Sequence, residues 1–215
     1  MAPNTLPIFP LHTPVLFPRC VAPLHVFEPR YRALIHDALA GERRIGMVTV
    51  RPEVVDEMPG DPAIFPVGCA GFIAQHQQLA DGRYLILLQA TTRFRVVREQ
   101  PKRAARLYRV AEIEPLDELP GDPARADAHR EQIVRQLGEL VSRDAERNAE
   151  IDLGRLEGLD PGAFASEISQ ALRLPALEKQ ALLEANSAAE RLERLAQTLS
   201  FYRTLSSSGP AETIH

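Results

Sequence analysis

The chain has 215 residues, of which 45% are hydrophobic and 25% charged, and its net charge is −4. This composition is typical of a globular protein with one large domain or one domain in two lobes, and it provides no general attraction to nucleic acid or anionic lipid. No apolar run approaches the roughly 18–20 residues needed to cross a bilayer. Prolines at positions 3, 7, 10, 14 and 18 argue against a signal peptide.

The two cysteines, Cys20 and Cys69, are 49 positions apart and form no C-x-x-C motif. This spacing excludes a zinc knuckle and a thioredoxin-type dithiol. Both cysteines have apolar neighbours, so we expect small buried side chains in a reducing, cytoplasmic setting.

The N-terminal part of the chain begins with three short extended segments, "LPIFPL", "PVLFP" and "VAPLHVF". A helix is predicted to start at the Glu28-Pro29 step, because proline suits the first helical position. The apolar residues after Pro29 recur at helical spacing through residue 39, and Gly41 suits the helix end.

Most of the β-type runs follow this helix. We predict strands at 45–50, 67–79, 84–90, 92–99 and 106–115, with a hairpin turn at Asp81-Gly82. Residues 51–66, with four prolines and a glycine, are predicted to form a loop. Many short strands with one early helix indicate a small barrel or sandwich.

The remainder of the chain is predicted to be helical. An amphipathic stripe covers residues 124–143, Asp160 and Pro161 begin a second helix, and a short helix lies in 174–185. "SAAE" at 187–190 is a capping box that opens a final helix. We therefore expect an α+β chain with three parts: a β lobe with one helix (1–118), a helical lobe (119–205) and a flexible tail (206–215).

Five segments in the same order resemble the N-terminal substrate-binding domain of Lon proteases, the LON domain: "LPIFPLHTPVLFP", "FEPRYRAL", "FPVGCAGFI", "DGRYLILLQATTRFRV" and "DPGAFASEISQALRLPALEKQALLEANSAAERLERL". The resemblance covers roughly residues 5–205. It implies a PUA-like β-barrel lobe carrying a C-terminal α-helical bundle. It also implies binding of unfolded or non-native polypeptide segments, as an adaptor or quality-control factor working with a protease or chaperone.

The sequence departs from full-length Lon proteases in ways that predict a module without catalysis. It contains no G-x-x-x-x-G-K-[ST] and no Gly-Lys dipeptide, so the phosphate-binding loop of an ATPase is missing. Lys102 and Lys179 are its only lysines, and neither has the context of a Ser-Lys peptidase site. The resemblance is therefore to a stand-alone LON-domain protein without ATPase and peptidase modules. We expect no catalytic residue and no cofactor.

The loop at 51–66 supplies the predicted binding residues. Long loops in compact domains are often functional, and apolar side chains exposed there could contact an unfolded segment. The candidates are Val54, Val55, Met58, Ile64 and Phe65. The alternative is that Ile64 and Phe65 pack back into the barrel.

A basic segment supports a second hypothesis, an RNA-binding PUA-like protein. Its candidate nucleic-acid face comprises Arg93, Arg95, Arg98, Arg103 and Arg106. Acidic residues at 112–127 offset this charge, and no exposed aromatic series is interleaved for base stacking. Nucleic acid is accordingly the less favoured partner, and no membrane partner is expected. The six histidines are scattered without metal-ligand spacing, so no metal site is predicted.

Overall fold

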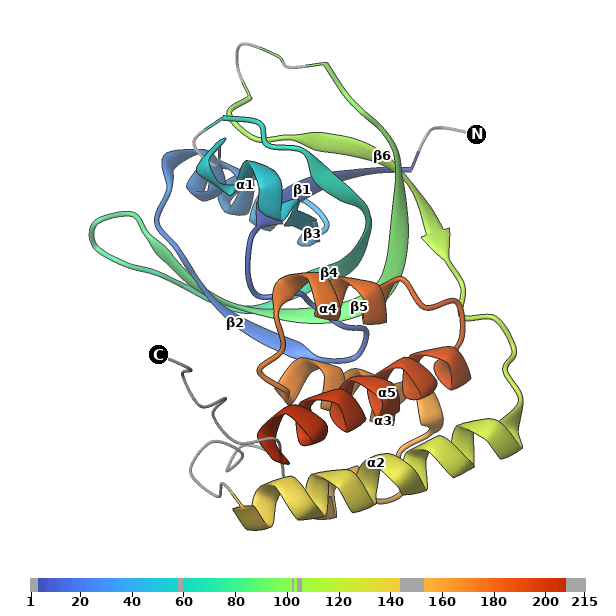
Figure 1. Ribbon diagram of the computed structural model, residues 1–215. Helices are drawn as coiled ribbons and strands as arrows, with labels where there is room; N and C mark the ends of the chain where they lie inside the picture. The colour runs from blue at the N-terminus through green and yellow to red at the C-terminus, as the bar shows by residue number, and fades with distance from the viewer. Residues whose placement is uncertain (1–3, 58–59, 102, 104–105, 144–152, 208–215) are drawn as a thin grey trace, which may run out of the picture. The chain divides into compact units, whose positions relative to one another are not determined.

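A computed structural model describes residues 4–57, 60–101, 103, 106–143 and 153–207 (Figure 1). The elements in chain order are β1 (Thr5–Leu11), β2 (Val21–Val26), α1 (Pro29–Ala40), β3 (Arg44–Val50), the 3₁₀ helix η1 (Pro52–Glu57), β4 (Ile64–Gln78), β5 (Tyr84–Glu99), β6 (Val110–Leu116), α2 (Pro123–Arg143), the 3₁₀ helix η2 (Leu153–Leu156), α3 (Pro161–Ala171), α4 (Ala176–Leu183) and α5 (Ala188–Ser207). This mixture confirms the predicted α+β class. No helix within the described ranges is long and apolar enough to span a membrane.

The chain divides into two compact units. The first comprises Met1–Asp117 and Leu174–Glu184, and the second comprises Glu118–Arg173 and Ala185–His215. The predicted division assigned all of 119–205 to a helical lobe, so the structure differs in placing α4 with the strands. The predicted tail lies outside the described residues from position 208 onward.

The first unit is built on a sheet that closes on itself. The strand order is β2-β5-β4-β3-β1-β6, and β5 also pairs with β6. Five strands therefore form a closed ring in which each has two neighbours, and β2 is attached outside the ring through β5 alone. The β1–β3 pair is parallel, because α1 carries the chain back between the two strands.

One buried cluster draws side chains from every strand of the ring: Leu6, Ile8, Val48, Ala70, Phe94, Ala111 and Ile113. Phe94 fills the centre of this cluster because two strands carry glycine beside it. A Cβ on Gly46 would lie 2.7 Å from the Phe94 ring, and one on Gly68 would lie 2.8 Å from it. Close packing at these positions therefore requires glycine.

Helix α1 starts at Pro29, as predicted, with Glu28 in extended conformation before it. Tyr31, Leu34 and Ile35 are buried on one face of the helix. The Tyr31 hydroxyl donates to the carbonyl of Pro10 at 3.0 Å, and burial raises the pKa of Tyr31 to about 12. The helix ends before Gly41, whose N–H donates to the Ala38 carbonyl.

Buried polar contacts attach α4 to the strands of the first unit. The Gln180 side chain is 1% exposed, and its Oε1 accepts from the Thr49 hydroxyl at 2.6 Å. Its Nε2 donates to the carbonyl of Val67 at 2.9 Å. Arg93 of β5 donates to the carbonyl of Leu183 at 2.9 Å. Helix α4, although it comes late in the chain, thus provides hydrogen-bond partners for buried polar groups of the strands.

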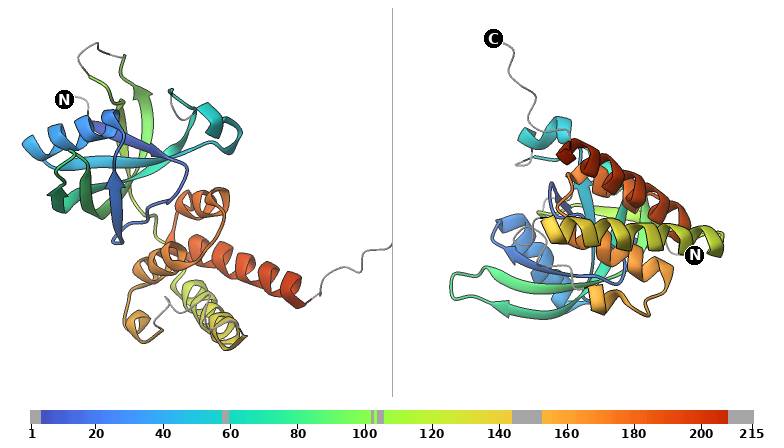
Figure 2. Two further views of the ribbon diagram at one scale, coloured as in Figure 1. Left: turned by 90° about the vertical axis from the view of Figure 1, so that its left-hand side faces the viewer. Right: turned by 60° about the horizontal axis from the view of Figure 1, so that its bottom comes forward.

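The second unit is a helical bundle in which α2 and α5 lie side by side and α3 packs against α5 (Figure 2). Asp160 caps α3 as predicted, accepting from the backbone N–H groups of Gly162 and Ala163 at 3.0 Å. The Ser187 hydroxyl accepts from the Glu190 N–H at 3.1 Å, whereas the Glu190 carboxylate accepts from Asn186 N–H at 2.8 Å. In the standard capping box the Glu190 carboxylate would accept from the N–H of Ser187, whereas here it accepts from the N–H of the preceding residue, Asn186.

Three predicted segments differ from the structure. "PVLFP" is not a strand, although Val15, Leu16 and Phe17 are buried. The predicted loop at 51–66 is shorter, because η1 forms at its start and β4 begins at Ile64. The strands predicted at 84–90 and 92–99 are one continuous strand, β5, because a long strand can pair with β2 and β6 at different points along its length.

Candidate functional site

Several exposed apolar side chains of the first unit lie on the outer side of β2, β5 and β4. The register places three rows of side chains across this face: Val21, Gln89 and Phe72; Pro23, Leu87 and Gln75; His25, Leu85 and Gln77. The alternate residues of β2 and β5 point inward and are buried, as the period of two requires. We call the outward residues of these rows, together with Phe27, the outer face.

Four large apolar side chains are unusually exposed on the outer face. The exposed fractions are 46% for Val21, 59% for Phe27, 41% for Phe72 and 41% for Leu85. The Phe27 ring lies 5.8 Å from the His25 ring, which holds it at the end of β2. Large apolar side chains exposed together on one face often mark an interaction site.

A groove of about 520 Å³ runs across this face. Its lining residues come from all three strands: Pro23, Leu24, His25, Gln75, His76, Gln77, Leu85, Ile86 and Leu87. None of them is aspartate, glutamate, lysine or arginine. The groove therefore offers apolar contact together with amide and imidazole hydrogen-bonding groups, a combination suited to an uncharged ligand.

The hairpin between β4 and β5 is held by its turn. Gly82 has a φ of +80°, which favours glycine, and its N–H donates to the Leu79 carbonyl. The Asp81 carboxylate accepts from the backbone N–H of Arg83 at 3.1 Å and from its guanidinium at 2.7 Å. The backbone hydrogen bond is the main cause of the lowered pKa of Asp81. A fixed turn keeps the rows of the outer face in register.

A second, smaller cavity of about 260 Å³ lies beside α1 and involves Arg30, Arg109 and Tyr108. Arg30 pairs with Glu28 and donates to the Gly60 carbonyl at 2.8 Å. Arg109 pairs with Glu99 and donates to the Pro62 carbonyl at 2.8 Å. Both arginines thus have carboxylate partners and anchor the segment before β4, so this cavity is weaker as a ligand site.

Three of the binding residues predicted from the 51–66 loop have side chains that the structure describes, and all three are half-buried. Val54 is half-buried, and Ile64 is half-buried against the core cluster. Phe65 is half-buried, with the Arg51 guanidinium 4.9 Å from its ring centre. Met58 and the side chain of Val55 lie outside the described residues. The alternative of packing back onto the barrel therefore describes Ile64, whereas Phe65 lies beside Arg51.

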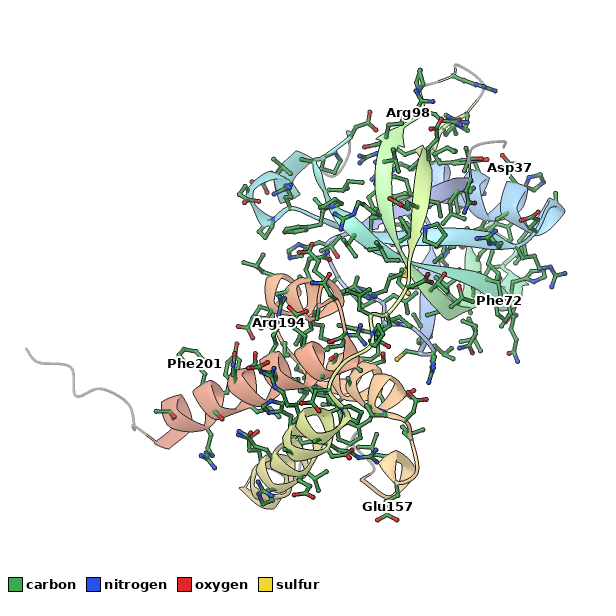
Figure 3. The ribbon with its side chains drawn as sticks, turned by 90° about the vertical axis from the view of Figure 1, so that its right-hand side faces the viewer. Asp37, Phe72, Arg98, Glu157, Arg194 and Phe201 are labelled. Atoms are coloured by element: carbon green, nitrogen blue, oxygen red, sulfur yellow. The ribbon has the colours of Figure 1, made fainter. Side chains whose placement is uncertain are left out.

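The predicted nucleic-acid face is also divided. Arg93 is 5% exposed and bonded to the Leu183 carbonyl, so it is not a surface residue, because its side chain reaches α4. Arg98 is exposed but paired with Glu112 at 2.7 Å, and Arg106 is half-buried beside Gln100. Arg95 and Arg103 are exposed. Figure 3 shows Arg98 at a different end of the first unit from Phe72.

The other predicted features have mixed placements. Cys20 and Cys69 are buried free cysteines, as expected. Lys179 is half-buried on α4, and burial lowers its pKa, whereas Lys102 lies outside the described residues. Within the described ranges, histidine, cysteine and carboxylate groups form no cluster of three or more that could hold a metal ion.

Sequence reasoning missed the outer face, although one signal was present. "VAPLHVF" alternates two sets of residues, and both sets are largely apolar. Only Ala22, Leu24 and Val26 face the interior. A strand with two apolar faces is typical of a fully buried sheet, but Pro23 and His25 are exposed, so one apolar face of this strand is left uncovered.

Comparisons with known proteins place the chain in one family. The model of the ATP-dependent protease La (LON) substrate-binding domain matches residues 5–200. The Lon protease of Azorhizobium caulinodans is 30% identical over 194 residues, which are 89% of this chain and 22% of that protein. The Lon protease of Flavobacterium johnsoniae is 31% identical over 193 residues, 88% of this chain and 23% of that protein. The chain thus spans less than a quarter of the length of these curated relatives.

Two solved structures share the fold. The Lon N-terminal domain protein from Xanthomonas campestris aligns with a TM-score of 0.62 and 23% identity, covering 90% of this chain and 98% of that one. The N-terminal domain of the Mycobacterium avium complex Lon protease aligns with a TM-score of 0.68 and 20% identity, covering 92% and 98%. With a family model that matches nearly its whole length, this chain belongs to the LON substrate-binding domain family.

Proposed function

We propose that this chain is a non-catalytic polypeptide-binding module that recognises exposed apolar segments of non-native proteins. The proposed site is the outer face of β2, β5 and β4. The single observation that carries this assignment is a groove of about 520 Å³, lined without aspartate, glutamate, lysine or arginine, on a face that carries four large apolar side chains, each at least 41% exposed. Water contacts this apolar surface in the free protein, so a ligand that covers it gains hydrophobic free energy.

Three features support the rest of the proposal. The closed ring of strands is consistent with a PUA-like β-barrel, and the packing of α2, α3 and α5 is consistent with a C-terminal helical bundle. The sequence lacks a phosphate-binding motif, and the family matched is named for substrate binding. The two buried cysteines suit a cytoplasmic protein. We include in the proposal a role as an adaptor or quality-control factor that presents a bound segment to a protease or chaperone.

Titration of a fluorescent, permanently unfolded polypeptide tests the proposal. Phe72→Ser and Leu85→Ser should each weaken binding by at least about fivefold, the loss that a central interface residue produces. Val97→Ser and Leu107→Ser are matched controls, because these side chains of the first unit are 61% and 63% exposed and neither lines the groove. The controls should bind within about twofold of the unmodified protein. Equal losses for all four variants, or no binding at all, would contradict the proposal.

The same titration with mixed-sequence RNA addresses the alternative function. Phosphate contacts are strongest at low salt, so an RNA-binding protein should retain RNA there and release it as salt rises. The buried Arg93 and the Arg98–Glu112 pair leave Arg95 and Arg103 as the exposed cations of that face without a recorded carboxylate partner. Salt-sensitive RNA binding without polypeptide binding would move the site to these arginines.

A further inference from the structure

Strand β2 has an open edge beside the outer face. It pairs with β5 along its whole length, from Val21 opposite Gln89 to Val26 opposite Tyr84. Among the described residues no strand pairs with its other side, whereas every strand of the closed ring has two neighbours. Figure 1 shows β2 running outermost beside β5 in the first unit. An open edge presents backbone groups that only another extended chain satisfies efficiently.

The register identifies the backbone groups at this edge. The Ala90 N–H donates to the Cys20 carbonyl at 2.9 Å, so these two opposite residues form a hydrogen-bonded pair. Alternate residues of β2 share this orientation, which directs the N–H and C=O groups of Ala22, Leu24 and Val26 toward β5. The corresponding groups of Val21, Pro23 and His25 therefore face the open edge, apart from the N–H that proline lacks. No recorded hydrogen bond within the described chain uses them.

Pro23 explains how the protein tolerates this edge. Proline removes one donor from the middle of the edge and so discourages pairing between two copies of the chain. The carbonyls of Val21, Pro23 and His25 and the N–H groups of Val21 and His25 remain. Six residues of strand span about 20 Å, enough for a segment of similar length.

The edge and the groove favour the same occupant. Pro23 and His25 line the groove with their side chains while their backbone faces the edge. A strand added at this edge would place every second side chain on the outer face, beside the exposed Val21 and the groove. The lining has no charged residue, so uncharged apolar side chains suit it. An extended apolar polypeptide supplies both the backbone groups and the side chains.

We propose that β2 captures its polypeptide ligand by strand addition, pairing backbone to backbone at Val21, Pro23 and His25 while alternate apolar side chains cover the outer face. This inference rests on the proposed function and specifies its ligand as an extended, uncharged, alternating segment. Backbone pairing supplies affinity without sequence specificity, and the groove selects apolar residues at every second position.

Backbone methylation of the ligand tests the inference. The probe is a soluble peptide of about ten residues in which phenylalanine or leucine alternates with threonine. One derivative carries N-methyl groups at the apolar positions and the other carries them at the threonines. Because alternate N–H groups of a strand point to opposite sides, only one derivative loses its bonds to β2. That derivative should bind at least about tenfold more weakly than the other.

The position of the loss also gives the direction of the added strand. Weaker binding of the derivative methylated at the apolar positions indicates antiparallel addition, because directly opposite residues then share a face and exchange hydrogen bonds. Weaker binding of the derivative methylated at the threonines indicates parallel addition. Equal binding of the two derivatives would overturn strand addition while leaving apolar recognition intact. If the unmethylated peptide and the unfolded polypeptide both fail to bind, the proposed function itself fails.

A protein variant provides an independent measurement. Pro23→Val restores the missing N–H and should tighten binding of the unmethylated peptide by roughly two- to tenfold, the effect of one added hydrogen bond. Pro66→Val is the control, because Pro66 is an exposed proline of β4 away from the groove. Affinity that is unchanged or weaker in Pro23→Val at protein concentrations where both variants are monomeric would count against strand addition.

Discussion

Replacing Gln180 with alanine tests whether α4 is an integral part of the first unit. In the structure Gln180 is 1% exposed and bonds to the Thr49 hydroxyl and the Val67 carbonyl. Alanine would leave both of those groups in the interior without this partner. A buried polar group that loses its partner costs about 1–3 kcal/mol, so we expect the free energy of unfolding of the first unit to fall by about 2–4 kcal/mol.

Urea denaturation followed by far-ultraviolet circular dichroism measures this loss. Gln78→Ala is the matched control, because Gln78 is an exposed glutamine of β4 and its replacement should change the free energy by no more than about 0.5 kcal/mol. Thr49→Val should cost less, about 1–2 kcal/mol, since it leaves only the Gln180 oxygen without a partner. The double variant should lose less than the sum of the two by about 1 kcal/mol, because both changes break the same hydrogen bond. A Gln180→Ala loss no larger than that of Gln78→Ala would refute the reasoning.

Three further predictions concern single positions. Leu34→Asp places a charge in a fully buried site and should prevent folding of the first unit. Ala40→Asp, on the exposed part of the same helix, should change the melting temperature little. Equal melting temperatures for the two variants would disprove the packing of α1. Gly82→Ala should lower the free energy of unfolding by about 1–2 kcal/mol, because the φ of Gly82 is +80°. Gly138→Ala, in a helix with open space around it, should raise that free energy by about 0.5–1 kcal/mol. Thermal unfolding measures both, and the reverse order would contradict the turn geometry. The Asn186 N–H lowers the pKa of the Glu190 carboxyl below 4.5, so Glu190 should stabilise the fold at neutral pH and lose this effect as the pH falls through 4.5 toward its pKa in the folded protein. Glu190→Gln should therefore have a lower melting temperature than the unmodified protein at neutral pH, and the difference should disappear in acid. A difference that stays constant with pH would be inconsistent with this cap.

Local sequence signals predicted the features whose backbone conformation is determined by residues close in the chain. Pro29 started α1, Asp160 capped α3, and the Asp81-Gly82 pair formed the β4–β5 turn. Each of these depends on neighbours within a few residues, where proline, a capping carboxylate or glycine has a direct steric or hydrogen-bonding effect.

Features that depend on distant partners were not predictable in the same way. Arg93 alternates with core residues and was assigned to the surface, but a carbonyl of α4 supplies a buried acceptor 90 positions away. The sequence of the short α4 resembles that of its neighbouring helices, but its contacts with the strands come from residues far away in the chain, such as Thr49, which is 131 positions from Gln180. Periodicity identifies an element's faces without identifying what lies against each face.

The candidate site shows the same limit. The sequence directed attention to the 51–66 loop because prolines and apolar residues stood together there. Ile64 instead continues into β4 and contacts the core cluster. Phe72 and Leu85 lie in segments whose sequence is typical of core strands. The register of β2, β5 and β4 places both residues on one face, and their exposure shows that this face is uncovered.

Site-specific photocrosslinking tests the central claim most directly. A photoreactive residue placed at position 85, on the outer face, is compared with one at position 107, since Leu85 and Leu107 are both exposed leucines of the first unit. With a permanently unfolded polypeptide present, we predict strong crosslinking from position 85 and little from position 107. Equal crosslinking from the two positions, or crosslinking from position 107 alone, would show that the outer face is not the polypeptide-binding surface.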